Sequence, residues 1–299
     1  MPAVLAQPVT LQLRMWWEMT RPRVLLLVLF TGLPVLGMVE GGFPRWGKAV
    51  IVLFGTALAG AASSTLNAYL ERDTDAHMAR TRNRPLPAAA LQPSHALTIG
   101  VALAFASTAV LYAIGGAFAA TVGAATILFY VFVYTLWLKP RTPQNIVIGG
   151  AAGATAPLIA EAALDGRLTF ASWLLFLIIF LWTPPHFWSL AIFRKDEYAA
   201  AGFPMMPNVV GDAATRRQSL FYTVVLVLVT LVPVPLGMLS WKYGIAALVV
   251  GTWFTGWIIR TMYANDPQVD YRAFRVSITY LFALFGAMLL DQVATALSG

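Results

Sequence analysis

Long apolar runs separated by short polar segments make up most of this chain. Nine runs approach the roughly 20 residues that a helix needs to cross a bilayer, although the first and fifth are shorter and rich in Gly or Pro. The runs cover Val24–Val39, Ala49–Leu70, Ala96–Ile114, Ala117–Leu138, Ile146–Ala160, Leu168–Phe193, Leu220–Leu239, Ile245–Met262 and Val276–Leu297. The pattern predicts an all-α, polytopic membrane helix bundle with nine transmembrane helices, in which residues 1–299 form a single domain.

Two adjacent glycines, Gly115 and Gly116, divide the apolar stretch between Ala96 and Leu138. Because a Gly-Gly pair favours a turn, we expect two spans there instead of one. The composition also indicates a membrane protein, with 59% hydrophobic and 11% charged residues and a mean hydropathy of +0.72. An ordinary soluble domain is about 25% charged. Cysteine is absent from the sequence, which excludes disulfides and thiolate metal sites.

The basic residues predict the orientation of the bundle. If the N-terminus is cytoplasmic, sixteen of the twenty Lys and Arg fall in cytoplasmic segments, as the positive-inside rule requires. The four on the other side are Arg45, Lys48, Arg167 and Lys242. Since the bases stand at the ends of apolar runs, the net charge of +7 reflects topology and not a nucleic-acid partner. Residues 1–23 form a cytoplasmic segment without an arginine-rich targeting stretch, which favours a prokaryotic inner membrane.

The most unusual polar stretch follows the second apolar run directly. On a helix, Asn67, Glu71 and Asp75 share one face because they are spaced four residues apart, whereas Asp73 falls off that face. Three oxygen-bearing side chains on one stripe suit Mg²⁺, which prefers carboxylate oxygens together with the phosphates of a ligand. The sequence therefore predicts a divalent-cation site at the cytoplasmic end of this helix.

Arginines in the same stretch offer planar, bidentate partners for such phosphates. They are Arg72, Arg80, Arg82 and Arg84. An alternative interpretation is a solvated juxtamembrane loop whose bases simply obey the positive-inside rule. That alternative explains the arginines but not the acids, so we expect residues 72–95 to form an active-site loop.

A second polar segment, residues 194–219, follows the sixth apolar run and is expected on the same membrane surface. Its first residues, Arg194–Tyr198, include Lys195 and Glu197. If the preceding helix continues, His186 and Glu197 share one face. An ionisable residue inside a membrane is a candidate functional residue. The alternatives are a neutral His186 bonded to a carbonyl freed by the neighbouring prolines, and an interfacial belt of snorkelling side chains.

A third segment, Leu138–Pro157, combines bases with small residues. Lys139 and Arg141 are candidates for holding phosphate, and Gln144 and Asn145 are candidates for capping the fifth span. The small residues from 149 to 154 permit close approach of another helix, the commoner use, or of a flat ligand. On the far side of the membrane, Glu161 and Asp165 are interpreted as loop residues.

Acidic patches with accompanying bases at the cytoplasmic ends of membrane helices fit a diphosphate held by Mg²⁺. The rest of such a ligand would lie in an apolar cavity, which points to a prenyl diphosphate. Cations neutralise the departing diphosphate, and the enclosed cavity keeps water from the allylic cation that remains.

At this point the motifs resemble a known family, the UbiA-type intramembrane prenyltransferases. The resemblance rests on N-x-x-x-E-x-D-x-D from Asn67, followed by R-T-x-N-R-P-L-P from Arg80. Further motifs resemble the haem-farnesylating subfamily, the protohaem IX farnesyltransferases. These motifs are T-R-P-R at Thr20–Arg23, R-T-P-Q-N-I-V-I-G-G-A-A-G-A at Arg141–Ala154, W-T-P-P-H-F-W at Trp182–Trp188 and E-Y-A-A-A-G-F-P-M-M-P at Glu197–Pro207. The resemblance covers about residues 20–211.

The resemblance implies a central cavity, farnesyl diphosphate and haem b as substrates, Mg²⁺ as cofactor, and farnesylation of the haem 2-vinyl group to give haem O. It implies that Mg²⁺ and diphosphate are held by Asn67, Glu71, Asp75 and Glu197. The diphosphate candidates are Arg80, Arg84, Lys139, Arg141, Arg194 and Lys195. The lipid bilayer surrounds the protein, and haem A synthase or a terminal oxidase assembly is a candidate partner.

Two positions depart from the family pattern. Glu71 stands where Asp is commoner, and the second motif has His186 in place of a paired D-x-x-x-D, which makes His186 a candidate haem contact. The alternatives are a UbiA-type enzyme with a quinone-precursor acceptor, and a transporter of an anionic substrate, which would favour intramembrane acids and inverted repeats. Neither feature of a transporter is clear in the sequence.

Overall fold

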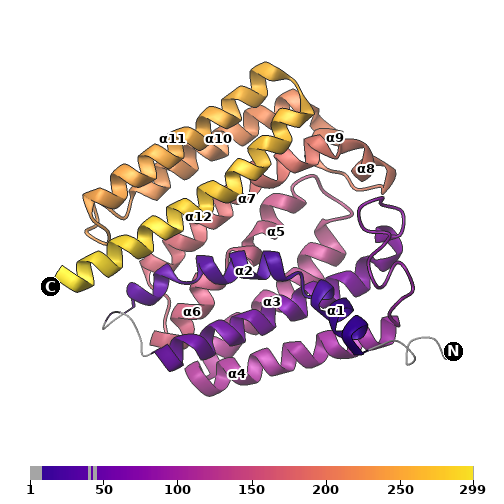
Figure 1. The fold of residues 1–299 in the computed structure, drawn as a ribbon, viewed down its shortest axis with the longest axis horizontal. Helices are drawn as coiled ribbons and strands as arrows, with labels where there is room; N and C mark the ends of the chain where they lie inside the picture. The colour runs from indigo at the N-terminus through magenta and orange to yellow at the C-terminus, as the bar shows by residue number, and fades with distance from the viewer. Residues whose placement is uncertain (1–8, 40–41, 43–45, 299) are drawn as a thin grey trace.

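The computed structural model describes residues 9–39, 42 and 46–298, and within them every regular element is a helix. Figure 1 shows three neighbouring groups: α3 and α4 on one side, α10, α11 and α12 on the other, and α5, α6 and α7 between them. The helices are α1 (Val9–Met19), α2 (Pro22–Thr31), η1 (Pro34–Gly37), α3 (Trp46–Asp75), α4 (Pro93–Leu128), η2 (Phe129–Leu138), α5 (Asn145–Gly153), α6 (Ala156–Asp165), α7 (Phe170–Phe193), α8 (Lys195–Ala200), α9 (Met206–Val210), α10 (Asp212–Leu231), α11 (Trp241–Ala264) and α12 (Pro267–Ser298). The all-α prediction is confirmed.

Six described helical stretches are long and apolar enough to cross a membrane. A seventh results if the pair Leu13–Met19 and Pro22–Gly37, bent by 49°, counts as one broken span. This count is lower than the nine predicted spans partly because Pro93–Leu138 is counted once. Arg45, one of the bases predicted on the far side, lies outside the described residues.

The chain nevertheless reverses at the predicted glycine pair. Gly116 has φ 70° and ψ −165°, a conformation that interrupts α4 and that only glycine adopts readily. A Cβ atom on Gly123 would lie 2.4 Å from Cδ1 of Leu111, although the two residues would be far apart along a straight helix. The two halves of α4 therefore lie side by side.

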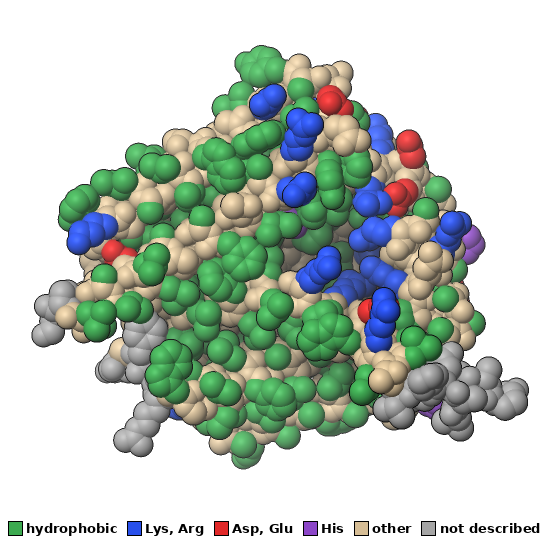
Figure 2. Space-filling model, viewed as in Figure 1, with side chains coloured by type: hydrophobic (Ala, Val, Ile, Leu, Met, Phe, Trp, Pro, Cys, Tyr) green, Lys and Arg blue, Asp and Glu red, His purple; other side chains and the backbone are tan. Residues whose placement is uncertain are grey.

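The core is centred on α7. In this helix 78% of the apolar window is buried, against 17% for Pro93–Leu138. Ile178 of α7 belongs to one buried cluster with Leu226 of α10, Phe254 of α11 and Leu284 of α12. Large apolar side chains that remain exposed cover the outside of the bundle, and Figure 2 shows them spread over most of the visible face. Such a surface matches the hydrocarbon of a bilayer.

The small residues of α5 pack against neighbouring helices. A Cβ atom on Gly149 would lie 2.1 Å from the Tyr134 ring, and one on Gly150 would lie 2.7 Å from Cγ2 of Thr183. The prediction of close helix packing is confirmed. The capping prediction is wrong, because Gln144 makes no side-chain capping bond and the Asn145 amide donates to the Thr142 carbonyl at 2.6 Å.

The interpretation of Glu161 as a loop residue is wrong. This residue lies within α6 and is completely buried. Its carboxylate accepts hydrogen bonds from the Thr169 backbone N–H at 2.7 Å, from the Thr169 hydroxyl at 2.5 Å and from the Ser172 hydroxyl. Glu161 therefore satisfies donors at the start of α7 and fixes where the central helix begins.

Candidate active site

The α3 helix runs without interruption to Asp75, so the predicted stripe forms as expected. Asn67, Glu71 and Asp75 are only 1%, 8% and 5% exposed, respectively. The Asp73 side chain is 82% exposed. Because the 3.6-residue period turns every fourth residue inward, the sequence was sufficient to identify this face.

Each member of the stripe has a basic partner from a different segment. Arg21, between α1 and α2, donates to Oδ1 of Asn67 at 2.8 Å. Lys139, directly after η2, donates to Oε1 of Glu71. Arg84, in the loop after α3, donates to Oδ2 of Asp75 at 2.8 Å. Three separate segments, two of them distant from α3 in the sequence, therefore converge on one helix face.

The two guanidinium groups among these partners, those of Arg21 and Arg84, lie close enough to affect each other. The pKa of Arg84 is lowered from its ordinary value, first by burial and then by the positive charge of Arg21, while Asp75 acts in the opposite direction. Cations crowded in this way, in a partly buried place, indicate a site prepared for an additional anion.

Arg21 was not predicted as a site residue. Its backbone has φ 52° and ψ 61°, a left-handed conformation that is strained for a residue other than glycine. Such strain concentrates at functional sites, and here it aims the side chain at α3. The only sequence signal was the T-R-P-R motif, in which Arg21 stands immediately before the proline that begins α2.

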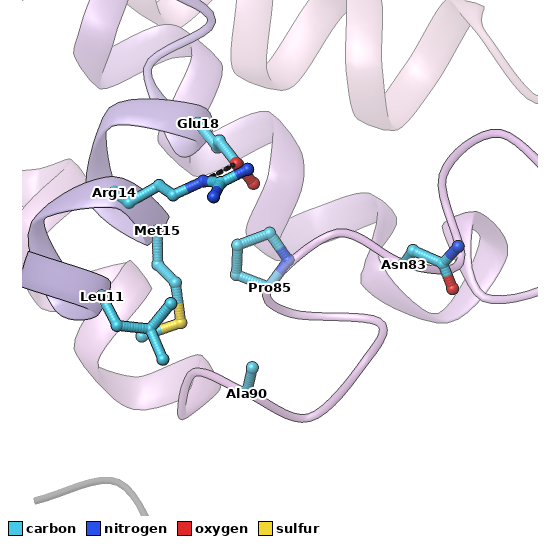
Figure 3. A pocket seen from close by; sticks show the side chains of 7 residues that line it. All are labelled: Leu11, Arg14, Met15, Glu18, Asn83, Pro85 and Ala90. Carbon is cyan, nitrogen blue, oxygen red and sulfur yellow. Dashed lines mark hydrogen bonds and ion pairs between the residues drawn. The ribbon is translucent and has the colours of Figure 1, made fainter. Parts of the chain in front are cut away.

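The loop that carries Arg84 packs beneath α1. Leu11 and Met15 of α1 face Pro85 and Ala90 of the loop across a pocket of about 260 Å³ (Figure 3). The remaining lining residues are Arg14, Glu18 and Asn83. Arg14 and Glu18 form an exposed ion pair at 3.1 Å, and α1 covers the loop.

Lys139 links the stripe to the second polar segment. Its Nζ pairs with Glu71 and also lies 4.8 Å from the centroid of the Phe203 ring, between α8 and α9. The α3 stripe and the predicted loop 194–219 therefore approach the same place. In Figure 2 basic side chains gather round a hollow on this face, together with a few acidic ones.

The second polar segment differs from the prediction in one respect. The α7 helix ends at Phe193, and Arg194 has a non-helical conformation of φ −111° and ψ 27°. Glu197 consequently lies on a separate short helix, α8, and does not continue the helix face of His186. Arg194 donates to Oε1 of Glu197 at 2.6 Å, and Lys195 pairs with Asp212 at 2.8 Å.

The remaining predicted bases are less close to the acids. Arg141 is exposed and donates to the carbonyls of Leu136 and Trp137 at 2.9 and 3.0 Å, so the structure turns it towards the end of η2. Arg80 is exposed as well, and its charge acts on Arg84. The stripe is thus served mainly by Arg21, Lys139 and Arg84.

His186 is buried in α7 and contacts α12. Its Nδ1 lies 2.6 Å from the hydroxyl oxygen of Ser277. Its ring stacks on Trp182, with 4.1 Å between the centroids, and on Phe274, with 4.5 Å between the centroids. The alternative prediction was that His186 bonds to a carbonyl freed by the prolines of its own helix. The structure instead shows His186 in contact with Ser277 and Phe274 of α12.

The oxygen donors of the site fit Mg²⁺. Among the described residues no group of three or more His, Asp or Glu is arranged to hold a metal alone. Mg²⁺, however, commonly binds through one or two carboxylates and completes its shell with water and substrate phosphates. In the described part of the chain, Oε2 of Glu197 is buried without a hydrogen-bond partner, which leaves one carboxylate oxygen open to a ligand.

Comparison with known proteins identifies relatives over most of the chain. The profile of the UbiA prenyltransferase family matches residues 27–286. Protoheme IX farnesyltransferase of Rhodopseudomonas palustris strain BisB5 is 47% identical over 280 residues, which are 92% of this chain and 89% of the relative. Protoheme IX farnesyltransferase of Gloeobacter violaceus is 44% identical over 279 residues, 93% of this chain and 92% of the relative.

Solved structures share the fold at low sequence identity. A structure described as digeranylgeranylglyceryl phosphate synthase has a TM-score of 0.78 at 15% identity, covering 94% of this chain and 99% of that one. A UbiA homolog from Archaeoglobus fulgidus bound to GPP and Mg²⁺ has a TM-score of 0.62 at 16% identity, covering 92% of this chain and 99% of that one.

Proposed function

The chain belongs to the UbiA prenyltransferase family, and from this premise we propose that it transfers the farnesyl group of farnesyl diphosphate to the 2-vinyl group of haem b, giving haem O. The observation that carries the donor chemistry is the buried α3 stripe with its three converging bases. The acceptor is proposed from relatives named protoheme IX farnesyltransferase that are 44–47% identical to this chain.

The site residues divide the work of binding the diphosphate. Asn67, Glu71 and Asp75, together with Glu197, would hold Mg²⁺, which supplies charge neutralisation to the departing diphosphate when bound. Arg21, Lys139 and Arg84 leave their present partners and donate to diphosphate oxygens. This exchange would cost little electrostatically, because a bound Mg²⁺ would supply positive charge to Glu71 and Asp75 in place of Lys139 and Arg84.

The reaction itself needs no covalent participation by the chain. The C–O bond of farnesyl diphosphate breaks with its electron pair leaving on the diphosphate, which gives an allylic cation. The π electrons of the vinyl group form the new C–C bond, and a cation remains on the carbon next to the porphyrin. Water adds there and loses a proton, which gives the hydroxyethylfarnesyl product. The apolar interior of the bundle limits the access of water until that step.

We also propose that the bundle crosses the membrane nine times, with the site at the cytoplasmic surface of a prokaryotic inner membrane. Support for this orientation comes from the three bases that converge on the stripe, Arg21, Lys139 and Arg84, because bases concentrate on the cytoplasmic side of membrane proteins. At the other end Lys48 donates to the Leu164 carbonyl at 3.1 Å. Accessibility of single cysteines to a membrane-impermeant reagent, in a chain that has none of its own, tests this orientation.

The decisive experiment incubates purified protein with haem b, farnesyl diphosphate and Mg²⁺ and measures the mass of the extracted haem. We expect a hydroxyethylfarnesyl adduct that disappears with EDTA and in Asp75→Asn. Unchanged haem, in a preparation that prenylates a hydroxybenzoate or a naphthoate, would overturn the haem assignment and establish a quinone-precursor acceptor. Flux of an anion into vesicles without prenyl transfer would instead support the transporter.

A further inference from the structure

The imidazole of His186 can move very little. The rings of Trp182 and Phe274 stack on it at interplanar angles of 20° and 28°, and Phe187 meets it edge-on at 4.8 Å between the centroids. A ring held between two others keeps its plane, and the lone pair of an imidazole nitrogen lies in that plane. The aromatic contacts therefore fix the direction in which each ring nitrogen points.

Ser277 of α12 determines which nitrogen carries the hydrogen. Its hydroxyl oxygen lies 2.7 Å from the Phe274 carbonyl oxygen and 2.6 Å from Nδ1 of His186. Two oxygens at 2.7 Å need a hydrogen between them, and only the hydroxyl can supply it. Since a serine has one hydroxyl hydrogen, the second contact needs a hydrogen from His186. The ring is therefore the Nδ1–H tautomer.

Within the described residues no group donates to the other nitrogen, Nε2. Its lone pair is consequently available.

We propose that Nε2 of His186 binds the iron of the haem substrate, and that Ser277 is the positioning residue that keeps this nitrogen unprotonated. The inference rests on the proposed function, because haem is the acceptor there. A neutral imidazole whose Nδ1–H is held by a second residue is the usual form of a histidine metal ligand. The Trp182 indole N–H donates to the Ser277 carbonyl at 2.9 Å, which ties α12 to α7 at this point.

Haem binding without farnesyl diphosphate tests the proposal separately from catalysis. Purified full-length protein is titrated with ferric haem b, and the complex is followed by visible absorption and electron paramagnetic resonance. We expect the spectrum of an imidazole-ligated haem in the unaltered protein. His186→Ala loses that spectrum, and added imidazole restores it.

Ser277 variants test the positioning role. Removal of a residue that orients a metal ligand typically weakens metal binding about 10- to 100-fold, so we expect a weakening of that size in Ser277→Ala. Ser277→Thr retains the hydroxyl and is expected to bind haem normally. The matched control is Ser219→Ala, which removes another buried hydroxyl that bonds within its own helix, to the Thr215 carbonyl at 3.0 Å.

An unchanged haem spectrum in His186→Ala would overturn the proposal. If that variant also made no haem O, His186 would act on the water that adds to the vinyl carbon and not on the iron. If the protein farnesylates haem normally and the haem spectrum is the same with and without His186, the proposed function stands and the iron-ligation proposal is overturned. If the spectrum shows an imidazole-ligated haem but the protein makes no haem O, the iron-ligation proposal stands and the proposed function is overturned.

Discussion

At the scale of single residues, the site consists of oxygen-bearing groups that already have cationic partners. Glu71 pairs with Lys139, and Asp75 pairs with Arg84. Removal of one member of such a partly buried pair leaves the other uncompensated, so the effect of a variant depends strongly on which base is changed. Sequence motifs alone did not separate Lys139 from Arg141, whereas their contacts do.

Lys139→Met is expected to lower kcat/KM about 10- to 100-fold, because it removes a charge-assisted contact to the diphosphate worth about 1.5–3 kcal/mol. Arg141→Met is the matched control, since among the described residues Arg141 donates to carbonyls at the end of η2 and not to Glu71. Steady-state formation of haem O measures both. Equal losses of kcat/KM in the two variants would show that the contact of Lys139 with Glu71 does not distinguish the role of Lys139 from that of Arg141.

At the scale of elements, the short helix α5 shows how small residues position the site. Gly149 lets α5 approach the Tyr134 ring of η2, and η2 leads directly to Lys139. The sequence predicted close packing here from composition, but it did not say which glycines are in contact. Gly153 of the same helix has no atom within 4 Å of the place where its Cβ would lie.

Gly149→Ala is expected to destabilise the protein and to reduce activity, because a methyl group 2.1 Å from the Tyr134 ring must displace η2. The expected cost is about 1–3 kcal/mol. Gly153→Ala should be neutral or stabilising by about 0.5–1 kcal/mol, since alanine restricts the unfolded chain. Thermal unfolding in detergent compares the two variants. Equal unfolding temperatures would refute the close contact between position 149 and the Tyr134 ring.

At the scale of the whole molecule, ligand binding should stabilise the bundle. The site joins the connection between α1 and α2, the end of α3, the loop after it, and the segment after η2. A diphosphate held by bases from all of these segments would add a further link between elements that already meet through polar contacts and apolar packing.

A non-hydrolysable farnesyl diphosphate analogue with Mg²⁺ is expected to raise the unfolding temperature, with a stabilisation of about 2.7 kcal/mol at a ligand concentration of 100 times Kd. EDTA should abolish most of the shift, because the carboxylates then repel the diphosphate. Asp75→Asn should reduce it as well. An equal shift with EDTA would show that the arginines and Lys139 suffice and that Mg²⁺ is not needed for binding.

The sequence by itself determined the features that depend on local periodicity. The apolar runs predicted a helical membrane bundle, the four-residue spacing predicted the stripe on α3, and Gly115 and Gly116 predicted the reversal within α4. These three predictions are correct because each depends on residues that are close together in the sequence, whose hydrophobicity and helical spacing can be read directly.

Only the tertiary structure decided how distant residues meet. Glu71 and Lys139 are 68 positions apart, His186 and Ser277 are 91 apart, and nothing in their local sequences specifies these pairs. The break at Arg194, the strained backbone of Arg21 and the burial of Glu161 likewise depend on neighbouring helices. Hydrogen bonds and ion pairs act over a few ångströms, so packing of the bundle determines which polar side chains reach one another.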